Sequence, residues 1–520
     1  MAAAPVTETY DVEGKGIAAL SRDLADGRVT SVELIRAYRA RIAALDHAGP
    51  MLQSVVALNP DAEAQAAASD QRRRHGTPPR PLEGIPILVK DNIETLDAMP
   101  TTAGSLALAD NITHRDAPLV ARLRAAGALI LGKTNLSEWA NFRSSVSISG
   151  WSGVGGLTRN PFALDRSPCG SSSGSAVAVA ASLAPAAIGT ETDGSITCPA
   201  SMTGLVGLKP TVGLVSRTHV VPISRTQDTA GPITHDVADA ALLLAVIAGT
   251  DPADPATALA DQHLPGHTSV ADAGALQGRR IGVLRFLAGH HVATDAVFAH
   301  ALDRLREAGA VLVELKDGPD MDALGTAETA AMLTEFKAGL DTYLATTAPA
   351  VKARSLAAVI AFNDQHDREQ GLYGQDLMRK AQATPGLDDP AYRAAVTRMR
   401  QMAGRDGIDR LLAQNRLDAL VAPTNGPAWV VDLINGDHAS DGASSLPAVA
   451  GYPHLTLPMG FVDGLPVGLS FIGPAWSEQR LLGFGYAFQA KAQIHPRPRY
   501  LPSLELSATE RTLLAPARKL

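Results

Sequence analysis

Residues 169–210 have the sequence CGSSSGSAVAVAASLAPAAIGTETDGSITCPASMTGLVGLKP, in which two Gly/Ser clusters flank a run rich in Ala and Val. The apolar run at residues 176–183 predicts a buried helix that begins just after the first cluster. Ser171 follows a glycine in the first cluster, and Ser195 follows one in the second. Backbone N–H groups of a glycine-containing turn such as Thr192–Ser195 can point together at a negatively charged oxygen. This stretch therefore predicts part of the core together with a candidate catalytic site.

Short apolar segments alternate with helical patterns on both sides of this stretch. A helix is expected after Thr30, because Thr30 and Glu33 have the spacing of a capping box, and Asp236 is placed to cap a second helix. Strands are predicted at residues 85–89, 128–131, 280–284, 310–315, 417–422, 454–458 and 467–472, and further helices at 117–126 and 237–247. This alternation is typical of an α/β fold with helices on both faces of a sheet.

The chain has 520 residues, and large α/β enzymes can hold this many around one sheet. We therefore expect a single domain over residues 1–520. Its expected parts are an N-terminal helical segment at 1–76, a core at 83–250, a mostly helical region at 324–415 and a return to the core sheet at 417–475. The basic run Arg72–Arg74 leads into a proline-rich stretch, so we expect a solvated linker there.

The formal charge of −7 argues against a nucleic-acid-binding protein, which needs a basic face. No membrane span is expected, because the longest apolar candidate, at 176–188, is short and is interrupted by Ser182 and Pro185. The first residues lack the pattern of a secretory leader, so we expect a cytoplasmic protein, or a periplasmic or secreted one if a leader was removed. The two cysteines, Cys169 and Cys198, are expected to be small buried residues, although one bond between them is possible.

Two patterns that resemble known motifs are rejected because their context is wrong. Residues 127–134 match the letters of a phosphate-binding P-loop, but the inner residues Ala-Leu-Ile-Leu favour a strand rather than a flexible loop. Residues 170–174 match the G-x-S-x-G nucleophile elbow, but a loop containing Pro168 precedes them where an elbow needs a strand. The pair His290–His291 lacks a partner motif, and we expect neither a metal nor a cofactor.

Lys90 lies at the end of the apolar run Ile85–Val89, which predicts a buried strand. A serine hydroxyl is a poor nucleophile until a base removes its proton. Burial disfavours the charged ammonium and lowers the pKa of a lysine, so a buried lysine can be that base. Asp91 should face away from it, because successive strand side chains point to opposite faces. Lys90, Ser171 and Ser195 can thus form a nucleophile and a proton path without a histidine.

Several ordered blocks of the sequence carry a family resemblance. They are GIPILVKDN at 84–92, GKTNLSE at 132–138, GSSSGS at 170–175, GTETDGSI at 189–196, GLVGLKPT at 204–211 and GLPVG at 464–468. On these blocks the chain is identified as a member of the amidase signature family. The resemblance implies a single large mixed β-sheet wrapped by helices and an amide hydrolase that needs no cofactor.

The resemblance also implies a role for each candidate residue. By motif position, Ser195 would be the acylated nucleophile and Lys90 the base. Ser171 would be a bridging serine that follows a cis peptide bond to Gly170. The neighbouring residues that would stabilise the oxyanion or bind substrate are Thr192, Asp193 and Gly194.

The chain departs from the common family pattern at two positions. Many members have GTDTGGSIR where this chain has GTETDGSIT, so that Asp193 replaces a glycine and Thr197 an arginine. Both changes disfavour small substrates that bear a carboxylate, and Asp193 can accept a hydrogen bond from an N–H of a peptide-like amide. The variant pattern resembles bacterial peptide amidases. This resemblance implies that Asn141 lines the substrate site and that the helical cap at 324–415 covers it.

We therefore expect a monomeric hydrolase that releases ammonia from the C-terminal amide of peptides through an acyl-enzyme on Ser195. One alternative is an aryl or aliphatic acylamidase acting on small molecules. Another is the amidase subunit of a tRNA-dependent amidotransferase, which would take ammonia from glutamine. Glutamine bears a carboxylate, which an arginine at position 197 could bind. Because this chain has Thr197 there, the sequence counts against that role.

Overall fold

The computed structural model describes residues 10–266, 270–438, 442–505, 511 and 514, and this part contains one sheet of 11 strands and a two-stranded ribbon. In spatial order the strands of the large sheet are β1 (Val55–Leu58), β3 (Leu129–Thr134), β2 (Pro86–Lys90), β6 (Ala186–Glu191), β8 (Thr229–Thr234), β7 (Val206–Lys209), β12 (His454–Val462), β13 (Leu465–Ile472), β11 (Ala419–Pro423), β9 (Arg280–Leu284) and β10 (Val311–Leu315). Strands β3, β2 and β6 run parallel, every pair from β6 to β11 is antiparallel, and β11, β9 and β10 are again parallel. The expected large mixed sheet is confirmed.

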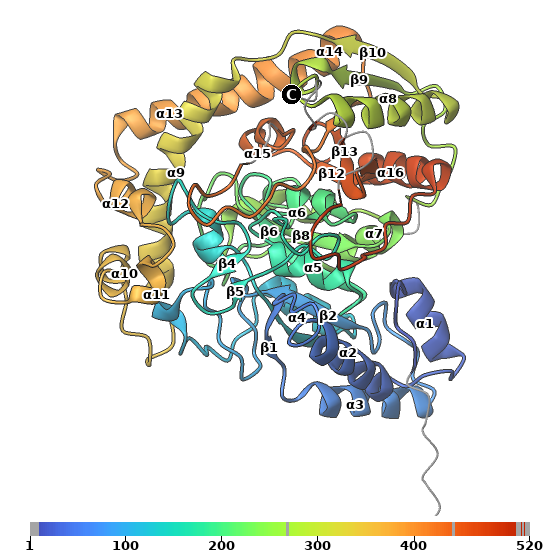
Figure 1. Cartoon of the computed structure of the whole chain (residues 1–520), viewed down its shortest axis with the longest axis vertical. Coiled ribbons are helices and arrows are strands. Elements are labelled where there is room, and N and C mark those ends of the chain that lie inside the picture. Colours follow the sequence, from blue (N-terminus) through green and yellow to red (C-terminus); the bar gives the residue numbers. More distant parts are fainter. Residues whose placement is uncertain (1–9, 267–269, 439–441, 506–510, 512–513, 515–520) are drawn as a thin grey trace, which may run out of the picture.

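Helices surround this sheet (Figure 1). They are α1 (Ile17–Ala25), α2 (Ser31–Leu45), α3 (Ala62–Arg74), α4 (Pro118–Ala125), α5 (Ser173–Ala180), α6 (Thr197–Met202), α7 (Val237–Ile247), α8 (Val292–Glu307), α9 (Met321–Leu344), α10 (Leu356–Asn363), α11 (Asp367–Gln370), α12 (Asp376–Gln382), α13 (Pro390–Arg400), α14 (Arg410–Asn415), α15 (Ser445–Ala450) and α16 (Glu478–Ala492). Helices α5 and α6 contact each other and the central strands, while α4, α7, α16 and α8 form a second connected row on the sheet. Helices α9 to α13 lie together along one side of the molecule, at the left of Figure 1.

Several local predictions agree with the structure because short-range chemistry decides them. Thr30 and Glu33 form the expected capping box at the start of α2. Asp236 accepts a hydrogen bond from the Asp239 N–H and caps α7, whose bounds match the prediction. Strand β2 ends at Lys90, as the apolar run indicated.

Four strands of the large sheet escaped the sequence analysis, namely β1, β6, β7 and β8, and so did the short strands β4 (Trp151–Ser152) and β5 (Gly156–Leu157) of the ribbon. The sequences of β6 (AAIGTE) and β8 (TAGPIT) contain glycine or proline and have weak intrinsic strand preference. Both strands are buried along their whole length in the middle of the sheet. Their neighbours on both sides, rather than their own composition, therefore determine the extended conformation.

The last hairpin is longer than the sequence analysis predicted. Strands β12 and β13 are joined by Asp463 and Gly464, whose φ angles are +48° and +83°. Two successive positive φ angles define a type I′ turn, for which Asp-Gly is a preferred sequence. The turn extends both strands beyond the predicted residues 454–458 and 467–472.

The basic run Arg72–Arg74 is not a linker, contrary to the expectation. It forms the last turn of α3. Arg72 lies 2.6 Å from a carboxylate oxygen of Glu83, and Arg73 lies 2.7 Å from one of Asp70. Cations in the last turn of a helix also interact favourably with its dipole. The run therefore ends the helix and ties it to the segment that leads into β2.

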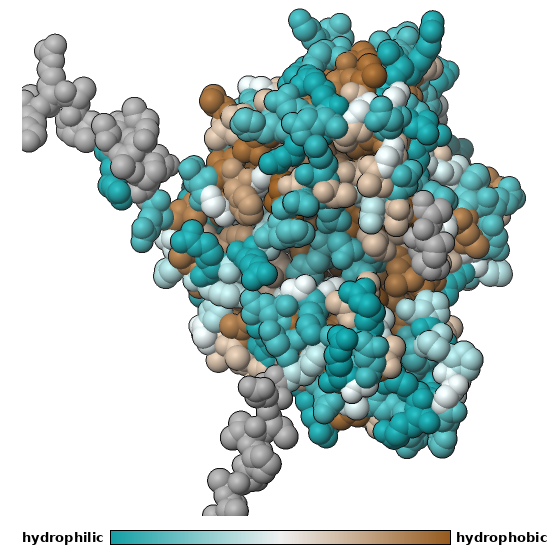
Figure 2. Space-filling view, turned by 90° about the vertical axis from the view of Figure 1, so that its right-hand side faces the viewer, coloured by the Kyte–Doolittle hydropathy of each residue, from teal (hydrophilic) through white to brown (hydrophobic). Residues whose placement is uncertain are grey.

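The described helices include none that is both long enough and apolar enough to cross a membrane. Figure 2 shows a face on which hydrophobic side chains are interspersed with hydrophilic ones.

Candidate active site

Lys90 is the last residue of β2 and is completely buried. Its Nζ donates a hydrogen bond to Ser171 Oγ at 2.8 Å and another to Thr190 Oγ1 at 2.8 Å. The Thr190 carbonyl oxygen lies 3.3 Å away. Asn92 Nδ2 also donates to Thr190 Oγ1, at 3.0 Å. The end of one strand thus delivers the ammonium group to Ser171, and the adjacent strand β6 supplies Thr190 to hold it there.

Burial lowers the pKa of Lys90 to about 7, although the nearby carboxylates of Glu191 and Asp228 act in the opposite direction. Asp91 does not contribute, because it faces away from Lys90 as expected. Its carboxylate lies 3.9 Å from Lys133 Nζ and accepts a hydrogen bond from Thr102. A substantial fraction of Lys90 is therefore neutral near pH 7 and able to accept a proton.

Ser171 follows a cis peptide bond from Gly170, as the family resemblance implied. A Cβ on Gly170 would lie 2.2 Å from Ser137 Oγ, so only glycine fits at this position. The next residue, Ser172, donates its backbone N–H to the Ser195 carbonyl oxygen at 3.1 Å. This bond brings the two Gly/Ser clusters of the sequence side by side.

Ser172, the centre of the G-x-S-x-G pattern, has a structural role. Its hydroxyl donates to the Thr190 carbonyl at 3.0 Å and accepts the Thr190 N–H at 3.2 Å. It lies at the start of α5, and a loop rather than a strand precedes it. The rejection of the nucleophile elbow is consistent with this geometry. Similarly, the inner residues of the P-loop pattern lie in β3 and its approach rather than in a loop.

The turn Thr192–Ser195 connects β6 to α6. Gly194 has φ +76°, a conformation that favours glycine. Within the described residues, the backbone N–H groups of Asp193, Gly194 and Ser195 have no hydrogen-bond acceptor. Ser195 is 9 % exposed, at the border between core and surface. The turn therefore offers free N–H donors beside a serine that solvent can just reach.

The ends of this turn are fixed by buried acceptors and donors. Glu191 accepts the backbone N–H groups of Ile196 and Thr197, at 2.8 and 3.0 Å. Thr197, at the position where many relatives have an arginine, also donates its hydroxyl to Glu191 and is fully buried. Thr192 Oγ1 donates to the Asp228 carboxylate at 2.6 Å. Position 197 thus stabilises the start of α6 and carries no positive charge.

Asp193 and Asn141 both have protein partners. Asp193 Oδ2 accepts a hydrogen bond from Ser445 Oγ at 2.7 Å. Asn141 Nδ2 donates to Ser147 Oγ at 2.9 Å and to Ser149 Oγ at 3.2 Å. A Cβ on Gly170 would lie 3.0 Å from Asn141 Oδ1, so this amide lies beside the cis peptide bond. The structure therefore places Asp193 on the turn that contains Ser195 and Asn141 beside the cis bond before Ser171, and their contacts with substrate stay a prediction.

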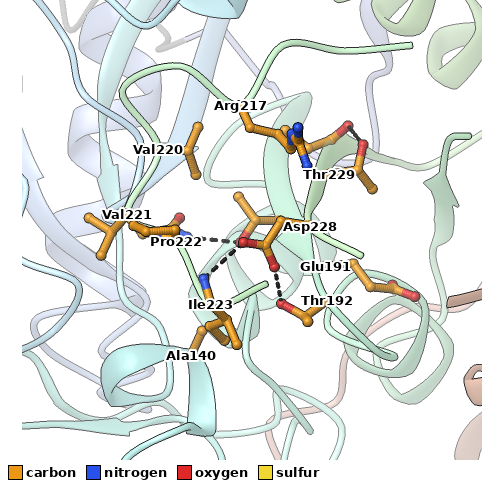
Figure 3. Close-up of a pocket in the computed structure, with 13 residues that line it drawn as sticks. Ala140, Glu191, Thr192, Arg217, Val220, Val221, Pro222, Ile223, Asp228 and Thr229 are labelled. Atoms are coloured by element: carbon orange, nitrogen blue, oxygen red, sulfur yellow. Dashed lines mark hydrogen bonds between the residues drawn. The ribbon is translucent and has the colours of Figure 1, made fainter. Parts of the chain in front are cut away.

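A cavity of about 40 Å³ lies next to this group (Figure 3). Its lining residues are Asn92, Ala140, Thr190, Glu191, Thr192, Arg217, Val220, Val221, Pro222, Ile223, Asp228, Thr229 and Ala230. Asp228 lies between the Thr192 hydroxyl and the backbone N–H groups of Ile223 and Ser224, and burial raises its pKa to about 6. A cavity of this size can hold ordered water. Sequence analysis gave no role to Thr190, although it lies in the block GTETDGSI, and none to Asp228, which lies outside all of the family blocks.

Cys169 and Cys198 form a disulfide, which corrects the expectation of two small buried thiols. Cys169 directly precedes the cis bond at Gly170, and Cys198 lies in the first turn of α6, just after Ser195. The bond therefore joins the two serine-bearing segments covalently. Sequence reasoning allowed this pairing but had no means to place the two sulfur atoms together.

The histidines noted in the sequence lie away from this chemistry. His291 accepts the Thr294 N–H and caps α8. His454 is buried against Ser470, and burial lowers its pKa to about 3. In the described ranges, no group of three or more His, Cys, Asp and Glu side chains could hold a metal ion.

A family model for amidases matches residues 33–482. The chain belongs to the amidase family. A probable amidase of Arabidopsis thaliana is 38% identical over 507 residues, which covers 95% of this chain and 93% of that protein. A glutamyl-tRNA(Gln) amidotransferase subunit from a Roseiflexus species is 36% identical, with 92% of this chain and 96% of that protein covered.

A solved structure shares both the fold and half of the sequence. The native peptide amidase of Stenotrophomonas maltophilia is 51% identical and superimposes with a TM-score of 0.88, covering 94% of this chain and 99% of that chain. The protein is therefore an amidase-family hydrolase that acts on carbon–nitrogen amide bonds, with a structure close to that of a peptide amidase.

The disulfide should contribute measurably to stability. Replacing both Cys169 and Cys198 by alanine removes a cross-link across a sequence separation of 29 residues. Restoring that freedom to the unfolded chain should lower the free energy of unfolding by about 2–4 kcal/mol. Urea unfolding monitored by tryptophan fluorescence measures the change, and an unchanged midpoint would contradict it.

Proposed function

We propose that this protein hydrolyses the C-terminal amide of peptides through a Ser195–Ser171–Lys90 mechanism. The observation that carries the proposal is the 2.8 Å hydrogen bond between the fully buried Lys90 Nζ and Ser171 Oγ. A buried lysine whose pKa is about 7 can act as a base at neutral pH. The Ser195 carbonyl oxygen accepts the backbone N–H of Ser172, the residue next to Ser171 in the chain.

In the first half-reaction, neutral Lys90 accepts a proton from Ser171 while Ser171 accepts the proton of Ser195. Ser195 Oγ then bonds to the amide carbon and forms a tetrahedral intermediate. As the C–N bond breaks, the proton returns from Lys90 through Ser171 to the leaving nitrogen, which departs as ammonia. The acyl group stays on Ser195 as an ester.

In the second half-reaction, water attacks the ester carbon and passes a proton along the same path. Ser195 regains its proton as the acid product leaves, so that amide and water give carboxylic acid and ammonia. In both steps the negative oxygen would lie against the free N–H groups of the turn at Asp193, Gly194 and Ser195. Donors fixed before the reaction stabilise such an oxygen without reorganisation.

Two residues near Ser195 support a neutral, peptide-like substrate. Asp193 places a carboxylate on the turn, which disfavours a substrate with its own carboxylate next to the amide. Thr197 supplies no cation to attract one, because it is buried against Glu191. The similarity to a solved peptide amidase at 51% identity favours the same substrate class.

Two other functions remain alternatives within the family. The similarity to an amidotransferase subunit makes glutamine the test substrate for the first. An aryl or aliphatic acylamidase is the second. Because position 197 has an uncharged threonine, it offers no positive charge to the carboxylate of glutamine, and this favours peptide amides as substrates. We expect a monomer that acts without a partner protein.

Removing the nucleophile or the base should abolish turnover. Ser195→Ala and Lys90→Ala should each lower kcat for ammonia release from an amidated dipeptide by more than about 10⁴-fold, since members of a nucleophile–base unit act together. Ammonia measured by a coupled assay, with thermal unfolding as a control for folding, provides the readout. Turnover of Ser195→Ala at the wild-type rate would refute the mechanism.

Activity should depend on the protonation of Lys90. Because only neutral lysine accepts a proton, kcat/KM should rise about tenfold per pH unit well below pH 7 and level off above it, in line with a pKa of about 7. The pH profile of ammonia release between pH 5 and 9 measures this. A profile that is flat below pH 7 would show that another group is the base.

Substrate preference separates the three functions. With equal enzyme, an amidated dipeptide should release ammonia with a kcat/KM at least about tenfold above that of free glutamine, a difference of about 1.4 kcal/mol. An anilide tests the acylamidase alternative, and faster turnover of the anilide would favour that function. Elution at the size of a monomer with full activity would agree with independence from a partner.

A further inference from the structure

The turn that carries Asp193 lies against a second buried acid. Glu328 projects from α9, is 5 % exposed, and accepts a hydrogen bond from Gln227 Nε2 at 2.7 Å. Its carboxyl group also lies near the Asp193 side chain, which acts on Glu328 both through its charge and through a side-chain contact. Asp193 Oδ2 is occupied by Ser445, whereas Oδ1 is buried and has no other donor among the described residues. A protonated Glu328 carboxyl group would supply a donor to this buried oxygen, which otherwise has none among the described residues.

Two carboxyl groups in hydrogen-bond contact cannot both be ionised without strong repulsion, so one of them keeps a proton. Burial, and then the negative charge of Asp193, raise the pKa of Glu328 well above its usual range. Glu328 is the more buried of the two acids. The shared proton therefore resides on Glu328, whose O–H can donate a hydrogen bond to the Asp193 carboxylate.

We propose that Glu328 is a positioning residue: as a neutral acid it donates a hydrogen bond to Asp193 and thereby ties helix α9 to the turn that precedes Ser195. This inference rests on the proposed function, since it concerns the turn expected to bind the oxyanion. Glu328 acts through Asp193 and touches no reacting atom.

Gln227 connects Glu328 to the turn Thr192–Ser195 by a second route. Gln227 Nε2, which donates to Glu328, also lies 3.4 Å from the Thr192 carbonyl oxygen. On the other side, a Cβ on Gly194 would come within 3.0 Å of Ser444 Oγ, just before α15. The turn is thus held between α9 on one side and the start of α15 on the other. Removing the donor at Glu328 would free one of these two sides.

Replacing Glu328 by glutamine tests whether Glu328 acts as a neutral hydrogen-bond donor or as a charged carboxylate. The carbonyl oxygen of the glutamine would accept from Gln227, and its NH₂ group would donate to Asp193. Glu328→Gln should therefore preserve both contacts, whereas Glu328→Ala removes both. Glu328→Leu fills the same space without a donor and serves if the alanine variant fails to fold.

The same helix provides a matched control. Glu335, also on α9 and 2 % exposed, accepts hydrogen bonds from the Thr226 N–H, the Thr226 hydroxyl and the Tyr392 hydroxyl, at 3.2, 2.9 and 2.7 Å. The Ser224 hydroxyl is a further donor to it. A group that only accepts is poorly replaced by glutamine, whose NH₂ would face donors. Glu335→Gln should therefore lower stability, whereas Glu328→Gln should not.

The experiment combines turnover with a readout that does not need the natural substrate. A fluorophosphonate reagent reacts covalently with an activated serine, and its labelling rate reports the state of Ser195 and its turn. We expect Glu328→Gln to stay within about threefold of wild type in labelling rate and in kcat for an amidated dipeptide. Glu328→Ala or Glu328→Leu should lose about 10- to 100-fold in both, with a smaller change in KM, as for other displaced oxyanion donors.

The outcomes separate this inference from the proposed function. If Glu328→Gln falls as far as Glu328→Ala, Glu328 acts as a carboxylate and the proposal is wrong. If Glu328→Ala labels and turns over like wild type, α9 does not position the turn and the proposal is also wrong. If the labelling rates follow the expected order while peptide amides are not hydrolysed, the inference stands and the proposed substrate class fails.

Discussion

Burial of the Lys90 ammonium at the end of β2 is the interaction on which the rest of the site depends. A lysine in water is protonated at neutral pH and cannot accept a proton, so the fold must remove it from solvent. The parallel strands β3, β2 and β6 achieve this, because the middle strand ends inside the protein between two neighbours. Thr190 on β6 then provides an acceptor that holds the ammonium without adding a charge. The Lys90 ammonium group also donates a hydrogen bond to Ser171 Oγ.

The placement of Ser195 against Ser171 requires two segments to converge from opposite ends of α5 and β6. One backbone hydrogen bond, from the Ser172 N–H to the Ser195 carbonyl, sets their relative position, and the Cys169–Cys198 disulfide fixes it covalently. Glu191 adds a third constraint by accepting the first N–H groups of α6. These constraints act on the backbone on either side of the serines, so they leave the hydroxyl groups free for the proton transfer that we propose.

Sequence analysis identified those parts of the molecule that depend on near neighbours along the chain. Residues only a few positions apart in the sequence determine three such features. They are the capping box at Thr30, the cap at Asp236 and the apolar strand that ends at Lys90. Family blocks added the cis bond at Gly170, which no local pattern would indicate. The central strands β6 and β8 were missed because neighbouring strands, not composition, impose their conformation. Thr190, Asp228 and Glu328 were missed because their importance arises from contacts between distant parts of the chain.

Glu328 shows how a helix far along the sequence can affect the chemistry. Helices α9, α10 and α12 form a cluster of buried apolar side chains with Trp139 and Phe142, which flank Asn141. Helix α9 thus contacts the site twice, through this cluster beside Asn141 and through Glu328 beside Asp193. A substrate that displaced these helices would move both contacts, because one rigid helix carries them. The fit of the substrate beside Asn141 would then affect the position of the turn that contains Asp193. Such a coupling would give a reason for a buried acid pair at a position where an apolar contact alone would be easier to accommodate.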